Sequence, residues 1–369
     1  GLPPLFEPGL DELLSANIQA NRLRYTTDLS EGVQGARYVL ITYDTPVNDR
    51  DEVDLFQIWD TASELAKHLE DGSVIVVNSQ VPVGTCGEIK ALIAKARPSL
   101  QFDIAYCPEN LRLGQAIGRF KNPDRLVIGA DDPRTLERVE ALFSVVHAPK
   151  IRMDLRSAEM VKHALNAFLA TSISFGNEIA NLCDEVGADA LKVVGALQLD
   201  ERIGGKLPLT PGLGFAGGTL ARDLKVLKKL GQESGCATPL IDGVLAVNER
   251  QNRVVVRKLE KAYGDLKGRT IGVLGLTYKA GTSTLRRSAA IEIIGELAAK
   301  GAQVKAHDPR ADPVEVAQHQ GFQFCPDPYQ VAEAADALVV VTDWPEFKAL
   351  DFGRIKARMR RPFLIDARN

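Results

Sequence analysis

The sequence predicts an α/β protein in which two parallel-sheet domains are joined by a long central helix and a helical middle domain. Residues 1–150 alternate short β-rich apolar runs with helical patterns, which is typical of βαβ units. Residues 157–186 contain no Gly or Pro except Gly176, and their apolar residues recur with a helical period. A second alternation of strand and helix patterns follows. The expected domains therefore span residues 1–150, 151–264 and 265–369.

The first domain is expected to hold a doubly wound sheet. Apolar runs predict its strands, and helical spacing of apolar residues predicts the helices between them. The strands are expected at residues 38–42, 73–77, 102–106 and 125–128, and the helices at residues 55–69, 87–96 and 133–143. Because parallel strands end at one edge of a sheet, we expect a ligand site at that edge.

The helix expected over residues 157–186 spans about 45 Å at 1.5 Å per residue, which favours a connector that also offers a dimer-forming face. An ordinary core helix explains most of its apolar positions equally well. A loop rich in Gly and Pro follows at residues 204–218, where backbone can approach a ligand closely. Further helices are expected after Thr219 and over residues 239–263, and further strands at residues 270–274, 303–306, 337–341 and 363–365.

The composition suits a globular protein of two or three domains. The chain has 369 residues with a formal net charge of -3, which gives no overall attraction to nucleic acid or to an anionic membrane. Its apolar runs are far shorter than the roughly 20 residues that span a bilayer, so no membrane insertion is expected. The five cysteines are odd in number and form no CxxC pair, which argues against disulfides and a zinc site and favours a reducing, cytoplasmic location.

Two polar residues of the long helix are candidates for a catalytic site. Lys162 and Asn166 are four residues apart and share one helix face, from which His163 is turned away. A Lys and an amide that converge on a site stabilise an alkoxide or position a water. Periodicity alone, however, favours a solvated Lys162.

Two acids are further candidates. Glu109 follows the strand expected at residues 102–106, where an open sheet carries catalytic carboxylates, although a helix-start carboxylate bonded to backbone amides explains it equally well. Asp223 lies four residues after Thr219 beside the Gly-rich loop, and a surface acid favoured by the helix dipole is its alternative explanation.

The second sheet domain contains half of a dinucleotide fingerprint. Gly272 and Gly275 follow one expected strand, and Asp308 closes the next, as a Gly turn and a ribose-binding acid do. The third Gly of the motif is missing. A Rossmann-type turn without nucleotide contact is an equally good interpretation.

Ordered phrases along essentially the whole chain match those of a known family. They include Val81-Pro-Val-Gly-Thr, Lys162-His-Ala-Leu-Asn166-Ala-Phe-Leu-Ala-Thr, Asn177-Glu-Ile-Ala-Asn-Leu-Cys, Pro211-Gly-Leu-Gly-Phe-Ala-Gly-Gly, Val247-Asn-Glu-Arg-Gln, Leu274-Gly-Leu-Thr-Tyr-Lys279 and Asp366-Ala-Arg368-Asn369. Together they resemble the UDP-glucose/GDP-mannose dehydrogenase family. Its members use NAD to oxidise the C6 alcohol of a nucleotide sugar to a carboxylate.

The resemblance implies an N-terminal Rossmann-like domain that binds NAD, a long central helix that helps to form a homodimer, and a C-terminal Rossmann-like domain that holds a UDP-sugar. It implies no metal. It also implies catalytic roles for four residues: Lys162 and Asn166 stabilise negative charge at C6, and Asp223 and Glu109 handle protons through a water. The implied substrate-binding residues are Arg202, Phe215, Gly217, Lys279 and Arg368, and the implied cofactor-binding residues are Thr45, Pro46, Ser79 and Arg286.

The sequence departs from the family's pattern in two respects. The family's Gly-rich phosphate loop, with its ribose-binding acid, is expected to precede Gly1, so that the opening βαβ unit is missing from the printed sequence. The family's Gly-Gly-Ser-Cys phrase reads Gly-Gly-Thr here, so that Thr219 stands at the position of the nucleophilic Cys. An alcohol needs an adjacent base to attack, whereas a thiol is partly ionised near neutral pH. Gln80 and the phrase Arg286-Arg287-Ser-Ala differ as well and suggest a divergent subgroup.

Three functions are compatible with these residues. The favoured one is NAD-dependent oxidation of a UDP-glucose-like sugar at C6, with the second oxidation step altered by Thr219. An isomerase or epimerase that borrows a hydride without net oxidation is the first alternative. A catalytically idle paralogue that binds a nucleotide sugar is the second.

Overall fold

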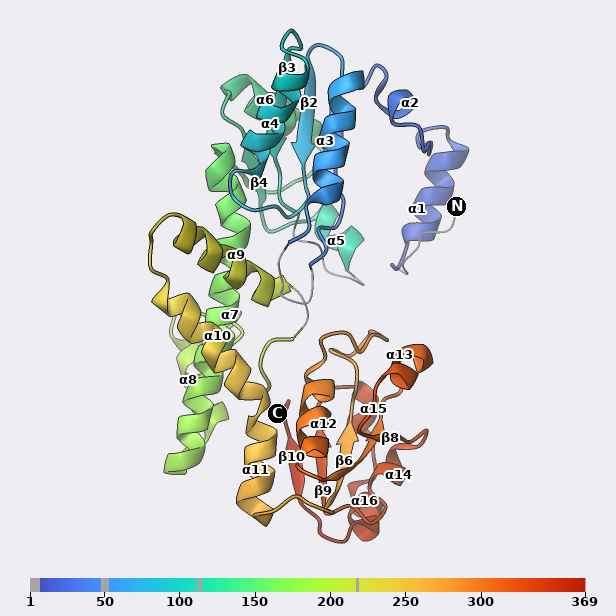
Figure 1. Ribbon diagram of the computed structural model, residues 1–369, viewed down its shortest axis with the longest axis vertical. Coiled ribbons are helices and arrows are strands. Elements are labelled where there is room, and N and C mark those ends of the chain that lie inside the picture. The colour runs from blue at the N-terminus through green and yellow to red at the C-terminus, as the bar shows by residue number, and fades with distance from the viewer. Residues whose placement is uncertain (1–6, 48–52, 110, 112–114, 217–218, 369) are drawn as a thin grey trace. The chain divides into compact units, whose positions relative to one another are not determined.

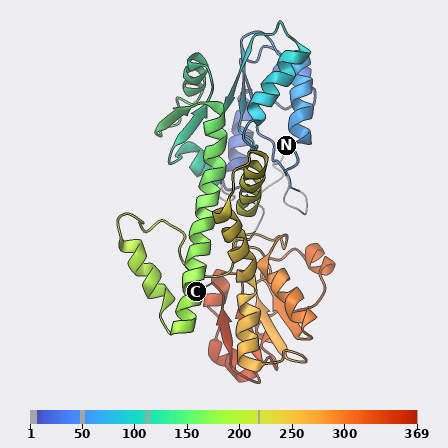
Figure 2. The ribbon, with the colours of Figure 1, turned by 60° about the vertical axis from the view of Figure 1, so that its left-hand side comes forward.

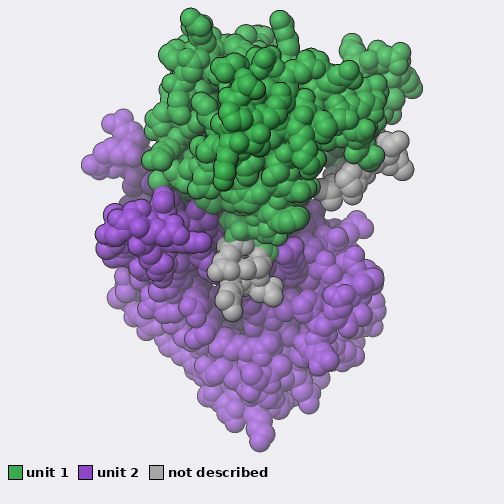
Figure 3. Space-filling model, turned by 45° about the horizontal axis from the view of Figure 1, so that its top comes forward, with its two compact units in different colours: residues 1–165 green, residues 166–369 purple. Residues whose placement is uncertain are grey.

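The chain folds as two compact units, residues 1–165 and 166–369, which Figure 3 colours separately. The structure is a computed structural model that describes residues 7–47, 53–109, 111, 115–216 and 219–368. The long helix α7 (Leu155–Val186) begins in the first unit and ends in the second, and it is the long green helix of Figures 1 and 2. Each unit contains one five-stranded sheet.

The sheet of the first unit has the order β1-β2-β3-β4-β5, and its strands pair in parallel except that β3 and β4 meet antiparallel at Tyr106 and Gly129. Its strands are β1 (Tyr38–Ile41), β2 (Ser73–Val77), β3 (Phe102–Tyr106), β4 (Leu126–Gly129) and β5 (Lys150–Met153). The helices that precede α7 are α1 (Leu10–Gln19), α2 (Leu29–Val33), α3 (Phe56–His68), α4 (Thr85–Ala96), α5 (Ala116–Lys121) and α6 (Pro133–Leu142).

Both faces of the interior strand β2 are buried because helices cover both sides of this sheet. Ile75 and Val77 pack in one apolar cluster with residues of α3 and α4, whereas Val74 and Val76 pack in another with residues of α6. Successive side chains of a strand point to opposite faces, so the continuous run Val74-Ile-Val-Val suits a sheet covered on both sides. This packing leaves the strand ends for polar groups.

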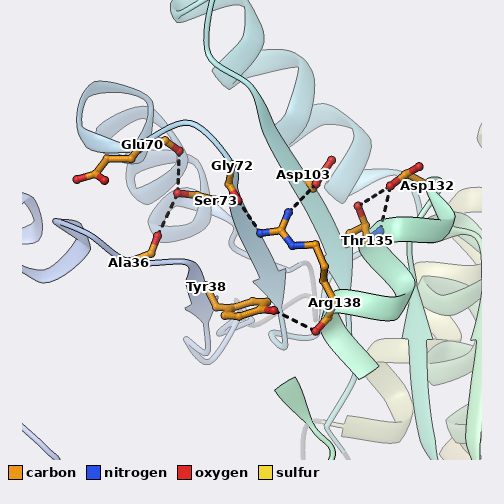
Figure 4. A network of polar contacts seen from close by, with 9 residues as sticks. All are labelled: Ala36, Tyr38, Glu70, Gly72, Ser73, Asp103, Asp132, Thr135 and Arg138. Atoms are coloured by element: carbon orange, nitrogen blue, oxygen red, sulfur yellow. Dashed lines mark hydrogen bonds and ion pairs between the residues drawn. The ribbon is translucent and has the colours of Figure 1, made fainter. Parts of the chain in front are cut away.

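Polar contacts join the amino ends of the strands in the first unit (Figure 4). The Arg138 guanidinium donates to Asp103 Oδ2 at 3.0 Å and to the Gly72 carbonyl at 2.6 Å, and the Tyr38 hydroxyl donates to the Arg138 carbonyl at 3.1 Å. The Ser73 hydroxyl also donates to backbone carbonyls there. The network lies at the end of the sheet opposite to the strand ends expected to bind ligand.

The second unit begins with the remainder of α7, and its sheet has the parallel order β10-β9-β6-β7-β8. Its other helices before the sheet are α8 (Ala190–Leu199), α9 (Thr219–Glu233), α10 (Pro239–Asn252) and α11 (Val254–Tyr263). The strands are β6 (Thr270–Leu274), β7 (Gln303–His307), β8 (Gln323–Phe324), β9 (Ala337–Val340) and β10 (Leu364–Asp366). The helices between them are α12 (Ala289–Ala299), α13 (Pro313–Gln318), α14 (Pro328–Val331), α15 (Pro345–Lys348) and α16 (Phe352–Arg358).

The predicted fold class is confirmed, with two Rossmann-like sheets and the long helix. Three local expectations differ from the structure. β5 and β8 were not expected, and the helical stretch expected over residues 239–263 divides at Arg253 into α10 and α11. No helix in the described ranges is both long enough and apolar enough to cross a membrane.

Candidate active site

Lys162 is held inside the first unit by Glu109. The side chain projects from the second turn of α7 and is only 8% exposed. Its ammonium donates to the Glu109 carbonyl at 2.6 Å and lies 3.8 Å from Glu109 Oε1. A buried ammonium is costly unless it is paired, so this arrangement fixes its position. The interpretation of Lys162 as a solvated surface residue is therefore wrong.

Glu109 follows β3, as expected, and serves two partners. One carboxylate oxygen accepts from the Leu111 backbone N–H, and the other faces Lys162. Glu109 does not start a helix, because the next helix in the described residues, α5, begins at Ala116. The contact with Lys162 is additional and makes Glu109 part of a paired, half-exposed site at the carboxyl end of the strand.

Asn166 and Asp223 form the corresponding pair in the second unit. Asp223 lies on the second turn of α9 and is 0% exposed, and the Asn166 amide nitrogen donates to its Oδ2. A fully buried carboxylate is not a surface acid favoured by a helix dipole, so that interpretation is wrong. Asn166 is also buried, which means that the amide is oriented by its partner rather than by water.

Lys162 and Asn166 lie one turn apart on the same face of α7, as the spacing predicts. Each is held by a carboxylate from its own unit. An ammonium and an amide N–H are both donors that stabilise negative charge developing on a substrate oxygen. Carboxylates are the side chains that accept a proton in the same process.

Thr219 is the first residue of α9, and its side chain is exposed. Among the described residues, no base accepts a hydrogen bond from its hydroxyl. An alcohol without such a base does not act as a nucleophile near neutral pH. The Thr219 hydroxyl, at the position where the resemblance predicts the nucleophile, therefore lacks the reactivity that covalent catalysis needs.

The cysteines of the chain are poorly placed to act as nucleophiles. All five are free, but Cys86, Cys107, Cys183 and Cys325 are buried. Burial raises the pKa of Cys107 to about 12, and burial together with the nearby charge of Glu159 raises the pKa of Cys86 well above its ordinary value. Cys236 is exposed but follows the far end of α9, whose fifteen residues span about 22 Å.

The Gly-rich loop is held by amide side chains that the sequence did not single out. Asn177 of α7 accepts from the Gly212 N–H at 2.8 Å and donates to the Leu213 carbonyl at 3.2 Å. Asn248 of α10 accepts from the Phe215 N–H at 2.7 Å and donates to its carbonyl at 3.2 Å, and Gln251 donates to the Gly212 carbonyl at 2.6 Å. In the sequence, these three residues are marked only as amide side chains within amphipathic helices.

Two glycines allow this loop to approach the helices closely. A Cβ on Gly176 of α7 would lie 2.2 Å from the Leu209 carbonyl oxygen. A Cβ on Gly214 would lie 2.7 Å from Asn248 Oδ1 and 2.9 Å from the Asn248 carbonyl oxygen. These distances are shorter than any real Cβ contact. The loop around Phe215 thus lies against the two helices only because both positions lack a side chain.

Three of the expected ligand-binding cations lie at the carboxyl edge of the second sheet. Lys279 and Arg286 are exposed in the loop after β6, with the Lys279 ammonium 5.6 Å from the centre of the Tyr278 ring. Arg368 follows β10, and its Nε donates to the Val341 carbonyl at 2.6 Å. Burial lowers the pKa of Arg368, whereas Asp343 and Asp366 oppose that shift. Because β10, β9 and β6 are neighbours, one edge carries all three.

Of the remaining expected substrate residues, Phe215 lies in the Gly-rich loop described above, and no contact among the described residues brings Arg202 to that edge. Arg202 follows α8, is largely exposed and pairs with Asp200 at 2.7 Å. Gly217 lies outside the described residues. Asp308 is engaged within the protein, since its Oδ2 accepts from Leu276, Thr277 and Trp344. That arrangement supports the Rossmann-type turn over a ribose-binding acid.

Polar groups also meet at the carboxyl ends of β1 and β2. The buried Thr45 hydroxyl donates to the Gln80 carbonyl at 2.7 Å, and the buried Ser79 hydroxyl donates to the Ile41 carbonyl at 3.3 Å, whereas Pro46 is exposed. Asn78 Oδ1 is buried and has no hydrogen-bond partner among the described residues. An unused amide acceptor beside the ends of parallel strands suits the carboxamide of a nicotinamide, so the residues present fit NAD. No group of three or more metal-ligating side chains occurs within the described residues.

Comparison with known proteins places the chain among nucleotide-sugar dehydrogenases. It is 39% identical to UDP-glucose 6-dehydrogenase TuaD of Bacillus subtilis, covering 100% of this chain and 80% of the relative. It is also 39% identical to UDP-glucose 6-dehydrogenase of Rhizobium meliloti, covering 100% and 86%. A UDP-glucose dehydrogenase structure from Pyrobaculum islandicum is similar with a TM-score of 0.89 at 33% identity, covering 100% of this chain and 84% of that one.

Three family models match consecutive parts of the chain. The NAD binding domain of the UDP-glucose/GDP-mannose dehydrogenase family matches residues 1–147, its central domain matches residues 156–250, and its UDP binding domain matches residues 272–369. The first match confirms NAD as the predicted cofactor. The chain belongs to the UDP-glucose/GDP-mannose dehydrogenase family.

Proposed function

We propose that this protein is an NAD-dependent dehydrogenase that oxidises the C6 alcohol of a UDP-sugar, with UDP-glucose as the first candidate. The observation that carries the proposal is the pair of buried donors one turn apart on α7, Lys162 and Asn166, each joined to a carboxylate. Family membership and the 39% identity to UDP-glucose 6-dehydrogenases support the choice of substrate.

In this proposal Lys162 and Asn166 stabilise the negative charge that develops on the C6 oxygen, and Glu109 or Asp223 takes the hydroxyl proton through a water. NAD, when bound, accepts the hydride from C6, so that alcohol and NAD become aldehyde, NADH and a proton. We assign the cofactor to Thr45, Pro46, Ser79 and Arg286. We assign the binding of the UDP-sugar to Arg202, Phe215, Gly217, Lys279 and Arg368. We propose that the domains span residues 1–150, 151–264 and 265–369.

We propose further that the reaction stops at the aldehyde. Oxidation to the carboxylate through a thioester needs a nucleophilic thiol, and Thr219 offers a hydroxyl that donates no hydrogen bond to a base among the described residues. The buried thiols of raised pKa do not supply it. The expected product is therefore a UDP-sugar aldehyde or its hydrate.

Counting NADH per sugar consumed tests the proposal directly. We expect one NADH per UDP-glucose when the full-length protein is incubated with excess NAD, measured by absorbance and by NMR of the sugar. Two NADH per sugar would mean that hydration of the aldehyde supports the second oxidation without a thiol. No NADH with any nucleotide sugar would contradict the dehydrogenase, and an altered sugar without NADH would identify an isomerase instead.

We propose that the protein is a homodimer formed through α7. Phe168, Phe175 and Leu182 lie seven residues apart on this helix and are 56%, 49% and 59% exposed. A seven-residue spacing keeps side chains on one face of a packed helix pair. A second copy presents the same apolar stripe, so the two helices are self-complementary. The five free thiols also support our placement of the protein in the reducing cytoplasm.

The variant Phe175→Glu is expected to convert the dimer to a monomer at micromolar concentration, because it places a charge at the middle of the stripe. Light scattering coupled to size-exclusion chromatography measures the mass. Phe352→Glu on α16, where the phenylalanine is 42% exposed, is the matched control and should leave the mass unchanged. A monomeric wild-type protein, or a Phe175→Glu variant that stays dimeric, would contradict an α7 interface.

A further inference from the structure

The first turns of α7 carry two buried ionisable side chains that the proposed chemistry does not use. Glu159 is 0% exposed and His163 is 1% exposed, and they flank Lys162 in sequence. Both reach the segment between β2 and α4, which includes Ser79. Neither group is an incidental core residue, because each is joined to a specific backbone atom of that segment.

Glu159 binds the backbone where α4 begins. Its Oε2 accepts from the Gly84 N–H at 2.5 Å, and its Oε1 accepts from the Cys86 N–H at 2.8 Å. Gly84 precedes the helix and has a φ of 101°, and it has no side chain with which to cap the helix. The carboxylate of α7 therefore takes over the hydrogen bonds that an N-cap side chain normally makes.

His163 holds the middle of the same segment. Its Nε2 lies 2.9 Å from the Val81 carbonyl oxygen, so this nitrogen is the one that carries the proton. On the preceding residue, the Gln80 carbonyl accepts from the Thr45 hydroxyl at 2.7 Å. The backbone between β2 and α4 is thus fixed at Gln80, Val81 and Gly84, and two of these three points are attached to α7.

We propose that Glu159 and His163 are positioning residues that fix the nicotinamide side of the NAD site relative to Lys162. The inference rests on the proposed function, in which Ser79 contacts the cofactor and Lys162 contacts the substrate oxygen. Both side chains project from the same short stretch of helix as Lys162, so the segment cannot shift without losing a buried hydrogen bond. Hydride transfer needs reacting atoms held at about 3–3.5 Å, and a misplacement of 1 Å costs roughly 100-fold in rate.

Substitution of Glu159 or His163 should therefore weaken the binding of NAD far more than the binding of the UDP-sugar. In Glu159→Gln, one of the two backbone N–H groups faces an amide NH2 and loses its acceptor. We expect kcat/KM for NAD to fall about tenfold to 100-fold and the Kd for NADH, read from its fluorescence, to rise about tenfold. The Kd for UDP-glucose, measured by calorimetry, should change by less than about twofold, because the proposed contacts to that ligand lie elsewhere.

Two variants of His163 provide a second and independent test of NADH binding. His163→Leu removes the donor to Val81 and should reproduce the loss of NADH affinity. His163→Gln retains an N–H at the position of Nε2 and should restore most of it. If His163 served stability alone, His163→Gln and His163→Leu would bind NADH equally well once both variants are folded.

Asp103→Asn is the matched control, because it makes the same carboxylate-to-amide change in the contact with Arg138 at the opposite end of the sheet (Figure 4). It should leave the Kd for NADH and kcat unchanged at a temperature where all variants are folded. Lowered thermal stability of Glu159→Gln and His163→Leu with unchanged NADH affinity would overturn the inference. Absence of turnover in the wild-type protein would instead contradict the proposed function. The comparison of NADH affinity between the variants and the wild-type protein would still test the inference in that case.

Discussion

Lys162→Met is expected to lower kcat about 100- to 1,000-fold with UDP-glucose and NAD, while the Kd for UDP-glucose stays within about twofold. The ammonium is buried beside Glu109, so its charge acts in surroundings from which water is largely excluded. A charge that interacts with the developing alkoxide, but with no charge in the ground state, contributes to kcat rather than to binding. Steady-state kinetics and calorimetry measure the two quantities.

The control for this prediction is Lys192→Met on α8. Lys192 is paired with Asp189 but is largely exposed, and it should tolerate the same substitution without a change in kcat. Circular dichroism checks that Lys162→Met is folded, since removal of a buried charge also leaves Glu109 without its partner. A folded Lys162→Met variant with wild-type kcat would remove Lys162 from the catalytic site and with it the main support for the proposed mechanism.

Thr219→Cys is expected to raise the yield of NADH from one to two per UDP-glucose. A thiol at the start of α9 is a few per cent ionised near pH 7 and can add to the aldehyde, whereas the threonine hydroxyl donates no hydrogen bond to a base among the described residues. Addition gives a thiohemiacetal whose hydride passes to a second NAD, and water then releases the carboxylate. The product is identified by mass spectrometry as the UDP-uronic acid.

Thr219→Ser separates the chemistry of the thiol from the size of the side chain. It keeps a hydroxyl, removes the methyl group and should still give one NADH per sugar. If Thr219→Ser gave two, the threonine would block the second step by its size rather than by its reactivity. A Thr219→Cys variant that stops at one NADH would show that the position does not reach the aldehyde.

The sequence predicted the regular elements better than their polar surroundings. The run Ser73–Val77 is apolar throughout because the strand is covered on both faces, and it was located without error. β5 was not expected because Lys150-Ile-Arg-Met has only four residues, two of them apolar, and is only partly buried, and β8 has only two residues. Short or half-exposed strands carry too few apolar residues for a period to be visible.

Burial of single polar residues could not be read from the sequence. Lys162 and Asp223 resemble surface residues of amphipathic helices, and only contacts from distant segments bury them. Glu159 gave no signal at all, because its partners Gly84 and Cys86 are more than seventy residues away and contribute only backbone N–H groups. The resemblance to a family points to Lys162 and Asp223 through matched phrases, whereas neither periodicity nor spacing contains information on tertiary partners.

The Gly-rich loop is held in place through its backbone, and this affects which substitutions it tolerates. Asn177, Asn248 and Gln251 bind backbone groups of Gly212, Leu213 and Phe215 rather than their side chains. The course of the loop is therefore independent of most side chains that it carries. Single substitutions of loop side chains can therefore change what the loop contacts while its backbone keeps the same course.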